Sequence, residues 1–346
     1  MSAALEGSAS PGPVLVVIPC LNEKAHIEDV VNTLASETAH IVLQIVVADG
    51  GSTDGTCEIV RRLSASNPKV TLMHNPERIQ AAGINRAVRK FGANAKFLIR
   101  ADAHASYPKN YCQTLLEVQA RTQADSVVVG MRTVGHTCFQ KAAAAAQNSV
   151  LGNGGSAHRN NRAGRWVDHG HHALMTIEAF TAVGGYDEAF SHNEDAELDA
   201  RLVDKGFRIY LTDAAQVTYF PRGSANGLFR QYFNIGRGRA RNLLKHRKTS
   251  KLRHLVLAAV APALCLMLLT PFAGWFAVPA LAWAFLCLGC GIFVGARLRD
   301  RCAMGAGIAA MAMQAGWSFG FFSGLLPAKA MPAAASGAVR RDQAAR

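Results

Sequence analysis

Apolar stretches of two different periods alternate along the N-terminal part of the chain. Residues 14–18 are a continuous apolar run rich in β-branched side chains, a pattern typical of parallel strands buried on both faces. Residues 41–48 predict a second strand. Between them, the apolar positions of residues 26–35 recur at helical spacing. We therefore predict an α/β fold, with a mostly parallel sheet and helices on both faces. Further strands are expected at residues 70–74 and 96–100, and further helices at residues 56–63 and 81–91.

The pattern is weaker between residue 127 and the basic segment near residue 230. A strand at residues 127–130 precedes an Ala-rich helix around residues 142–146 and a loop-rich segment. Residues 175–183 have the spacing of a helix, which Gly184 and Gly185 would end. Residues 194–202 then predict a short amphipathic helix.

The C-terminal third is apolar in a different way. Residues 255–296 contain no Asp, Glu, Lys, Arg or His, and a run of this length allows two bilayer crossings of about 20 residues each. Pro271 and Pro279 lie near its middle, where a turn between two helices is expected. A third uncharged stretch at residues 302–328 is richer in Gly and Met. Whether it spans or lies in the interface is left open.

These patterns divide the chain into segments. Residues 1–13 lack the basic start and apolar core of a secretory signal, so the following domain is expected in the cytosol. We expect a disordered N-terminus at residues 1–13 and a cytosolic α/β domain at residues 14–245. A basic linker at residues 246–254, a membrane region at residues 255–328 and a disordered tail at residues 329–346 would follow.

The net charge of +13 has a local origin. Nine Lys or Arg and no acidic residue lie between Arg230 and Arg253, directly before the first apolar run. The positive-inside rule places such a block on the cytoplasmic face, where it can attract anionic headgroups of membrane lipids. Because the block continues into a membrane segment, we do not expect a nucleic-acid partner.

The eight cysteines are scattered along the chain. Cys287 and Cys290 have CxxC spacing, but they lie in an apolar segment without a second pair of ligands. We expect the cysteines to be small buried apolar side chains in a reducing compartment, rather than zinc ligands or disulfides.

Polar clusters follow the predicted strands, at the sheet edge where open α/β folds bind ligands. Residues 19–23 follow the first strand, and the glycine-bearing turn at residues 49–55 follows the second. The glycines of that turn would let a ligand approach the backbone, and the next helix begins there with free N–H groups. A simple helix cap is an equal alternative.

Asp102 and His104 follow a further predicted strand. Their i, i+2 spacing puts both side chains on one side of an extended segment. A carboxylate and an imidazole there can share a divalent cation, which in turn binds diphosphate oxygens. A strand-end Asp beside a surface His is the alternative.

Glu194 and Asp195 begin the predicted helix at residues 194–202. The helix dipole stabilises acidic residues at this end, which accounts for one carboxylate but less well for two. A group that removes a proton from a substrate is the other interpretation.

Together these clusters resemble glycosyltransferase family 2, over residues 15 to about 241. The family has the GT-A fold, a Rossmann-like and mostly parallel sheet with helices on both faces, which C-terminal transmembrane helices would follow here. Residues 102–104 resemble its DxD metal motif with His in the last position, and residues 184–201 resemble its GGxD…ED block. Residues 167–172, 230–233 and 236–239 look most like the ExoA-type glucosyltransferases of succinoglycan assembly.

Two departures from the family pattern matter. His104 replaces the usual second Asp, and the QxxRW sequence of the processive synthases is absent. With two or three spans there is also little material for a polymer channel. The resemblance therefore implies an enzyme that adds one sugar at each encounter.

The resemblance also implies a site for a UDP-sugar donor, with UDP-glucose as the expected one. Asp49 would accept a hydrogen bond from the uracil, and Pro19, Asn22 and Glu23 would line the nucleoside pocket. The metal motif, Asp102 and His104, would hold Mg²⁺ or Mn²⁺ against the diphosphate. Arg237 and Arg239 would help to clamp the diphosphate, with a lipid phosphate as the open alternative.

For the acceptor, the resemblance implies a general base and an inverting single displacement. Asp195 would take the proton of the acceptor hydroxyl, and Glu194 would bind the acceptor or orient the site. The expected acceptor-binding residues are Trp166, His171 and His172. Trp166 could equally belong to the core.

The expected acceptor is a saccharide linked to undecaprenyl diphosphate, used in exopolysaccharide biosynthesis. The chain would then be a multi-pass protein of a bacterial-type inner membrane, with its catalytic domain in the cytoplasm. One alternative is a polyprenyl-phosphate sugar synthase, whose phosphate acceptor needs no general base. Another is a non-catalytic membrane scaffold of a polysaccharide assembly complex.

Overall fold

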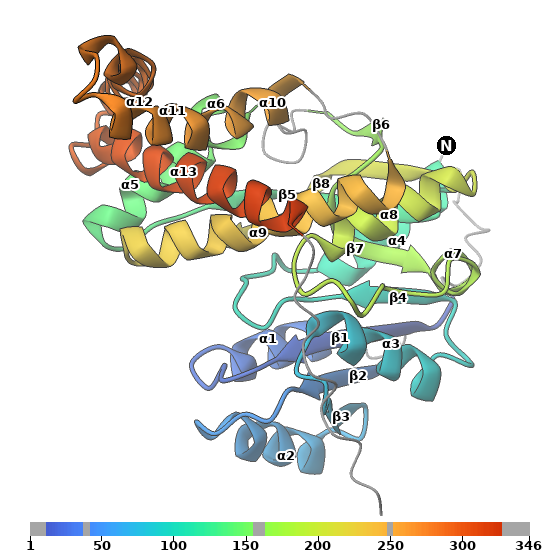
Figure 1. Ribbon diagram of the computed structural model, residues 1–346. Helices are drawn as coiled ribbons and strands as arrows, with labels where there is room; N and C mark the ends of the chain where they lie inside the picture. Colours follow the sequence, from blue (N-terminus) through green and yellow to red (C-terminus); the bar gives the residue numbers. More distant parts are fainter. Residues whose placement is uncertain (1–11, 37–41, 155–162, 248–251, 327–346) are drawn as a thin grey trace, which may run out of the picture.

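The computed structural model describes residues 12–36, 42–154, 163–247 and 252–326. They form an α/β domain and a layer of C-terminal helices above it (Figure 1). The expected disorder at residues 1–11 and 329–346 falls outside these residues.

The α/β domain is built on an eight-stranded sheet with the order β3-β2-β1-β4-β7-β5-β8-β6. Strands β1, β2, β3 and β4 are mutually parallel, as are β5 and β8, whereas β7 runs antiparallel between β4 and β5 and β6 runs antiparallel on the edge. The strands are β1 (Val14–Cys20), β2 (Val42–Asp49), β3 (Val70–His74), β4 (Phe97–Arg100), β5 (Ser126–Thr133), β6 (Arg165–Val167), β7 (His171–Thr176) and β8 (Ile209–Tyr219).

Helices cover both faces of this sheet, as predicted. In the fully buried strand β1, Val16 packs in a core with Ile27 of the first helix, and its neighbour Val17 packs in a second core with Leu198 on the other face. The helices of the domain are α1 (Ile27–Ser36), α2 (Thr56–Ser66), α3 (Gln80–Phe91), α4 (Tyr111–Thr122), α5 (Cys138–Gln147), α6 (Val150–Asn153), α7 (Ile177–Ala182) and α8 (Glu194–Asp204).

One predicted element differs. Residues 175–183 were expected to be a single helix, but Met175 belongs to strand β7 and the helix α7 begins only at Ile177. Ala173, Leu174 and Met175 are all buried, because β7 lies inside the sheet with a covered face on each side. Burial on both faces removes the alternation that identifies a strand.

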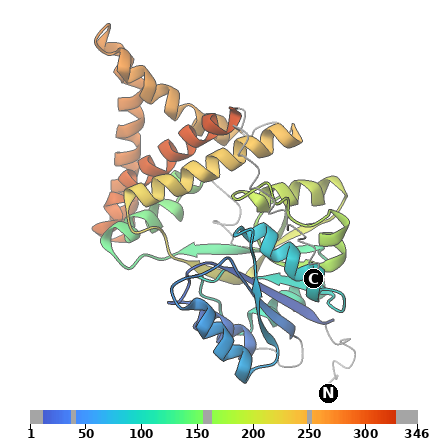
Figure 2. The same ribbon diagram turned by 60° about the horizontal axis from the view of Figure 1, so that its bottom comes forward.

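The C-terminal layer consists of apolar helices and one long basic helix. They are α9 (Ala225–His246), α10 (Leu252–Ala258), α11 (Val260–Leu266), α12 (Val278–Leu298) and α13 (Ala306–Leu325), with 3-10 turns η2 (Met267–Leu269), η3 (Gly274–Ala277) and η4 (Cys302–Gly305). Figure 2 shows α12 projecting away from the α/β domain.

Helices α9 and α13 lie side by side (Figure 1). A Cβ atom on Gly316 would lie 2.4 Å from the Phe229 carbonyl oxygen, and one on Gly320 would lie 2.0 Å from that of Phe233. Glycine is thus required at both positions of α13, as in close helix pairs of membrane proteins. The basic helix α9, expected within the domain at residues 14–245, therefore packs against α13 as part of the C-terminal layer.

Two segments are long and apolar enough to cross a membrane. Leu252–Leu269 and Gly274–Leu298 have mean hydropathies of 2.1 and 2.2, and only 11% and 17% of their most apolar windows are buried. Pro271 lies in the turn between them and Pro279 lies in the first turn of α12, as expected for prolines. The third stretch, α13, is not among these candidates, and much of it is buried against α9 and α5.

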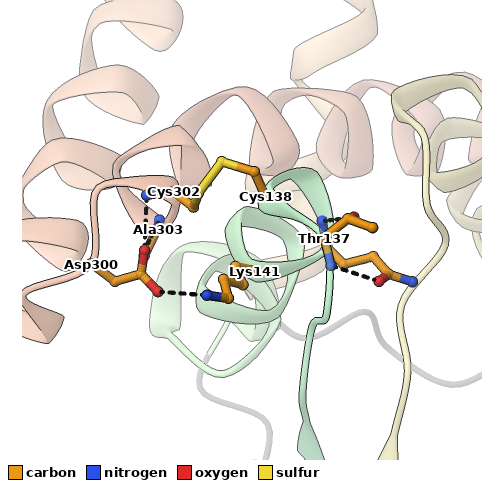
Figure 3. Close-up of a disulfide and its surroundings, with 7 residues drawn as sticks. Thr137, Cys138, Lys141, Asp300, Cys302 and Ala303 are labelled. Carbon is orange, nitrogen blue, oxygen red and sulfur yellow. Dashed lines mark hydrogen bonds and ion pairs between the residues drawn. A yellow bond between two sulfur atoms is a disulfide. The ribbon is translucent and has the colours of Figure 1, made fainter.

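Cys138 and Cys302 form a disulfide that joins α5 to η4 (Figure 3). The expectation that every cysteine is reduced is therefore wrong for this pair. The two residues are 164 positions apart, so their proximity depends on packing and could not be seen in their spacing. Beside them, the ammonium of Lys141 lies 4.0 Å from the carboxylate of Asp300.

Candidate active site

A cavity of about 590 Å³ lies between the carboxyl end of β4, the start of α8 and the start of α9. Its walls carry charged side chains from all three places. They include Asp102, His104, His171, Glu194, Arg222 and Arg230. Two clusters that are far apart in the sequence, around Asp102 and Glu194, therefore meet at one cavity, whereas the third cluster of the prediction, around Asp49, is not part of its wall.

Asp102 and His104 lie in the loop that follows β4. The Asp102 carboxylate lies 3.3 Å from the Arg100 guanidinium and 3.4 Å from Nε2 of His171, while Nδ1 of His104 lies 3.0 Å from Oε1 of Glu23. Burial opposes ionisation of Asp102, but the nearby cationic groups outweigh it and lower the pKa to about 2. Its hydrogen bond with Glu23 raises the pKa of His104.

These two side chains fit part of a metal site. Among the residues that the structure describes, no group of three or more His, Cys, Asp or Glu could hold a metal ion. An ionised carboxylate and an imidazole are suitable donors for a divalent cation. The other ligands would have to be oxygens of a bound diphosphate or water, which is common for Mg²⁺.

Arg100 joins the carboxylates of the two clusters. It is 7% exposed, and its guanidinium pairs with Asp195, lies 3.3 Å from Asp102 and lies 3.9 Å from Glu194. Burial opposes ionisation of Asp195, but Arg100 and His172 outweigh it and lower the pKa of the carboxyl. Asp195 is therefore held ionised, able to accept a proton.

Glu194, the adjacent residue, has a different environment. It lines the cavity, and Oε1 accepts a hydrogen bond of 3.2 Å from the side chain of Gln80. Burial first, and then the charge of Asp195, raise the pKa of Glu194 to about 7. Two neighbouring carboxyls with opposite shifts are typical of acid–base sites.

The two histidines of β7 face different surroundings. His171 lines the cavity, whereas His172 is 2% exposed and lies behind it. Nε2 of His172 lies 2.7 Å from Oδ1 of Asp199, and Nδ1 lies 2.7 Å from the hydroxyl of Tyr186. Of the two predicted acceptor-binding histidines, the structure thus brings only His171 to the cavity wall.

The turns after β1 and β2 are held together. Oδ1 of Asn22 accepts a hydrogen bond of 2.9 Å from the Thr53 amide, and the Ser52 hydroxyl accepts one of 2.8 Å from the Asn22 amide. The Asp49 carboxylate is buried and accepts hydrogen bonds from the Gly51 and Ser52 amides at 2.8 and 3.0 Å. Asp49 therefore shapes its own turn in this structure, and a uracil would have to exchange with these partners.

Two other predicted residues of this region lie at the same sheet edge. Pro19 is in register with Ala48 at the ends of β1 and β2. Glu23 reaches His104 and so connects the turn after β1 with the loop after β4. None of the predicted nucleoside residues lines the cavity, and Glu23 is connected to its wall through His104.

Three further predicted site residues also lie outside the cavity wall. Trp166 lies on the edge strand β6, where its ring is 5.1 Å from that of Tyr210 and 3.7 Å from the Arg208 guanidinium. Arg237 and Arg239 lie further along α9 and are not part of the cavity wall.

The arginines of the cavity wall, Arg222 and Arg230, were not predicted. Arg230 belongs to the segment 230–233 that resembles the ExoA-type enzymes, but it was given no role, and Arg222 belongs to no such segment. Their place at the cavity depends on how α9 is docked. Asp199 could have been found, since it follows Asp195 by four residues and so lies on the same helix face.

One protein of known name is similar in sequence over most of this chain. The chain is 53% identical over 313 residues to the succinoglycan biosynthesis protein ExoA of Rhizobium meliloti (strain 1021), which covers 90% of this chain and 94% of that protein. It is 21% identical over 233 residues, 64% of this chain and 71% of the relative, to a dolichyl N-acetyl-alpha-D-glucosaminyl phosphate 3-beta-D-2,3-diacetamido-2,3-dideoxy-beta-D-glucuronosyltransferase of Methanococcus voltae.

Solved structures with similar folds are more distant. Mannosyltransferase PcManGT from Pyrobaculum calidifontis, in complex with GDP-Man and Mn²⁺, has a TM-score of 0.49 and 21% identity over 91% of each chain. GalNAc-T7 with UDP, GalNAc and Mn²⁺ has a TM-score of 0.48 and 16% identity, over 67% of this chain and 48% of that one. With TM-scores below 0.5, neither structure is used to identify the family of this chain.

The assignment rests on sequence. The model of the glycosyl transferase family 2 matches residues 15–183, a range that contains the strands β1 to β7 and the metal motif. The 53% identity extends over 90% of this chain. The chain belongs to glycosyltransferase family 2 and is a glycosyltransferase.

Proposed function

We propose that this chain transfers one sugar at a time from a nucleotide sugar to a lipid-linked saccharide at the cytoplasmic membrane face, in exopolysaccharide biosynthesis. The reaction is inverting and metal-dependent, and UDP-glucose is the proposed donor. The observation that carries the proposal is the placement of Arg100, which holds Asp102, Glu194 and Asp195 beside one cavity. The identity with a protein named for succinoglycan biosynthesis supports the pathway class.

The donor would lie on the β4 side of the cavity. Asp102 and His104 would hold Mg²⁺ or Mn²⁺, and the ion would neutralise charge on the departing diphosphate. Arg222 and Arg230 offer further positive charge on the cavity wall, with Arg222 close enough to His104 to act on its charge, and guanidinium groups suit phosphate oxygens. The turns that contain Asn22, Glu23 and Asp49 would bind the nucleoside.

The acceptor would lie on the α8 side. Asp195 would take the proton from its hydroxyl as that oxygen attacks the anomeric carbon from the face opposite the diphosphate. An α-linked donor would then give a β product. Glu194 would bind the acceptor, although its pKa of about 7 and its place on the cavity wall make it a second candidate for the base.

The C-terminal helices suggest the nature of the acceptor. Two candidate spans follow the basic helix α9, whose N-terminal half lines the cavity. A saccharide on undecaprenyl diphosphate could then reach the site from the membrane surface. The name of the Methanococcus voltae relative likewise describes a dolichyl-linked acceptor.

The test uses membranes that contain the full chain, supplied with radiolabelled UDP- and GDP-sugars. We expect label from UDP-glucose in the lipid fraction and at least a hundredfold lower transfer by Asp102→Ala and Asp195→Asn. Asp213→Asn, at an exposed position of β8, is the matched control and should behave as wild type.

Other outcomes favour the alternatives. Full transfer by Asp195→Asn together with loss in Glu194→Gln would assign the base to Glu194. Retention in both variants would favour a polyprenyl-phosphate sugar synthase. No transfer from any donor would favour the non-catalytic scaffold.

A further inference from the structure

A buried chain of polar side chains begins at Asp195 and runs away from the cavity. The Tyr186 hydroxyl lies 3.3 Å from Oδ1 of Asp195 and 2.7 Å from Nδ1 of His172. Nε2 of His172 lies 2.7 Å from one oxygen of Asp199, and Nδ1 of His169 lies 2.6 Å from the other. The path connects the proposed base to groups that no substrate in the cavity could touch.

This arrangement is deeply buried. The side chains of His172 and Asp199 are 2% and 1% exposed, whereas that of His169 is 37% exposed. Oδ2 of Asp199 also accepts a hydrogen bond of 3.2 Å from the Gly170 amide. A buried carboxylate is costly unless it is paired, and here every neighbour of Asp199 can donate to it.

Base catalysis leaves a proton on Asp195, and that proton lies beside a cation. Asp195 pairs with the guanidinium of Arg100, which disfavours the neutral carboxyl. The filled cavity would leave no water to take the proton before the products depart. Among the described partners of Asp195, the Tyr186 hydroxyl contacts a group behind the cavity that can hold a proton, His172. Arg100 also donates to that hydroxyl at 3.4 Å, and Nδ1 of His172 itself lies 3.4 Å from Oδ1 of Asp195.

We propose that His172 accepts the acceptor's proton from Asp195 through the Tyr186 hydroxyl and holds it, paired with Asp199, until the products leave. The inference rests on the proposed function, in which Asp195 is the base. Asp199 and His172 are positioning residues, because they act on the substrate only through Asp195.

The proposed transfer moves one proton from Asp195 to His172 and leaves Tyr186 with the same number of protons. At rest, the Nε2–H group of His172 donates to Asp199, and Nδ1 accepts from the Tyr186 hydroxyl. Protonated Asp195 gives its proton to the Tyr186 oxygen as Tyr186 gives its own to Nδ1. Asp195 becomes a carboxylate again, Tyr186 is unchanged and His172 is an imidazolium. Once the cavity opens, the reverse transfers return the proton to water.

The charges around His172 favour this role. They come from Asp195 and Asp199 of α8, Arg100 of β4 and His171 on its own strand. Burial disfavours the imidazolium, but the two carboxylates outweigh burial and Arg100, and they raise the pKa of His172 above its ordinary value.

The test compares wild type with His172→Gln and Tyr186→Phe, which keeps the ring but removes the bridging hydroxyl. We expect kcat to fall at least tenfold in both, with the donor KM changed by no more than about twofold. Because His172 must be neutral to accept, wild-type kcat should rise with pH above 6.5, and His172→Gln should lose that rise.

His246→Gln is the matched control. The side chain of His246 is only 10% exposed, and its Nε2 lies 3.1 Å from Glu197 of helix α8, away from the cavity wall. It should leave kcat and the pH profile unchanged.

Other results would overturn the inference. A lower kcat with an unchanged pH rise would indicate a structural role alone, and a rise that disappears in Glu194→Gln instead would belong to Glu194. Tyr186→Phe should fold even where His172→Gln does not, so wild-type kcat in Tyr186→Phe would also refute the relay. Activity of Asp195→Asn, by contrast, would refute the proposed base itself.

Discussion

Arg100 is buried at the end of β4, with its guanidinium facing three carboxylates. The strand places it there, because β4 is parallel to β1 and ends at the edge where the polar turns gather. Its charge lowers the pKa of Asp102 and of Asp195. Arg100 thus favours the ionised form of both carboxyls.

We expect Arg100→Gln to lose activity and about 3–5 kcal/mol of stability, since removing one partner of a buried pair leaves uncompensated charge. The Asp102 carboxyl, with a pKa of about 2, contributes stability above its ordinary value of 3.8 that is lost as pH falls through about 2. In the variant this acid-sensitive contribution should disappear.

Thermal unfolding in detergent between pH 7 and pH 2 measures both effects. Arg62→Gln is the control, because its pair with Glu28 is exposed on both sides and should contribute less than about 1 kcal/mol. An equal effect of the two substitutions would contradict the role given to Arg100.

At the scale of elements, α8 and the α9–α13 pair position much of the cavity wall that lies outside β4 and the loop after it. Helix α8 presents Glu194 to the cavity, Asp195 beside it and Asp199 one turn later. Helix α9 brings Arg230 to the cavity wall, and Arg222 reaches it from the segment just before α9. The position of α9 depends on close contact with α13. The glycines of α13 are therefore expected to affect activity from a distance.

Gly320→Ala tests this contact. A Cβ atom there would lie 2.0 Å from the Phe233 carbonyl oxygen, so the helices must separate, at a typical overpacking cost of 1–3 kcal/mol. We expect a lower unfolding temperature and reduced transfer. Gly289→Ala in α12 is the control, because no neighbouring atom lies within 4 Å of a Cβ added there, and it should change neither quantity. Wild-type stability and transfer in Gly320→Ala would show that the close helix contact is dispensable.

At the scale of the whole molecule, the disulfide between Cys138 and Cys302 ties the C-terminal layer to the α/β domain (Figure 3). It closes a segment of 164 residues that includes α8 and α9. In the chain-entropy model, a cross-link that closes a loop of this size stabilises the folded protein against unfolding by about 4–5 kcal/mol.

We therefore expect reduction of the disulfide to lower the unfolding temperature. Cys138→Ser should lower the unfolding temperature as well, and adding reductant to this variant should have no further effect. Alkylation of the unfolded chain before and after reduction gives a direct count. Of the eight cysteines, two should react only after reduction. Labelling of all eight without reductant would refute the cross-link.

Several elements could be predicted because their signals are local. The strands β1 to β4 and helices α1 to α3 follow from apolar period and from the polar turns between them, and they were predicted within a few residues. The grouping of Asp102 with Glu194 followed from the family resemblance. Strand β7 was missed because Leu174 and Met175 are buried on both sides, so that its pattern resembles a helix as much as a strand.

Local sequence patterns thus determined the α/β domain, its polar strand ends, the apolar C-terminal run and the family. Tertiary packing alone decided that Arg222 and Arg230, rather than Arg237 and Arg239, line the cavity. Packing likewise placed His172 between Asp195 and Asp199 and joined Cys138 to Cys302. The reason is physical: period and turn chemistry act between residues a few positions apart, whereas these contacts depend on how distant elements dock.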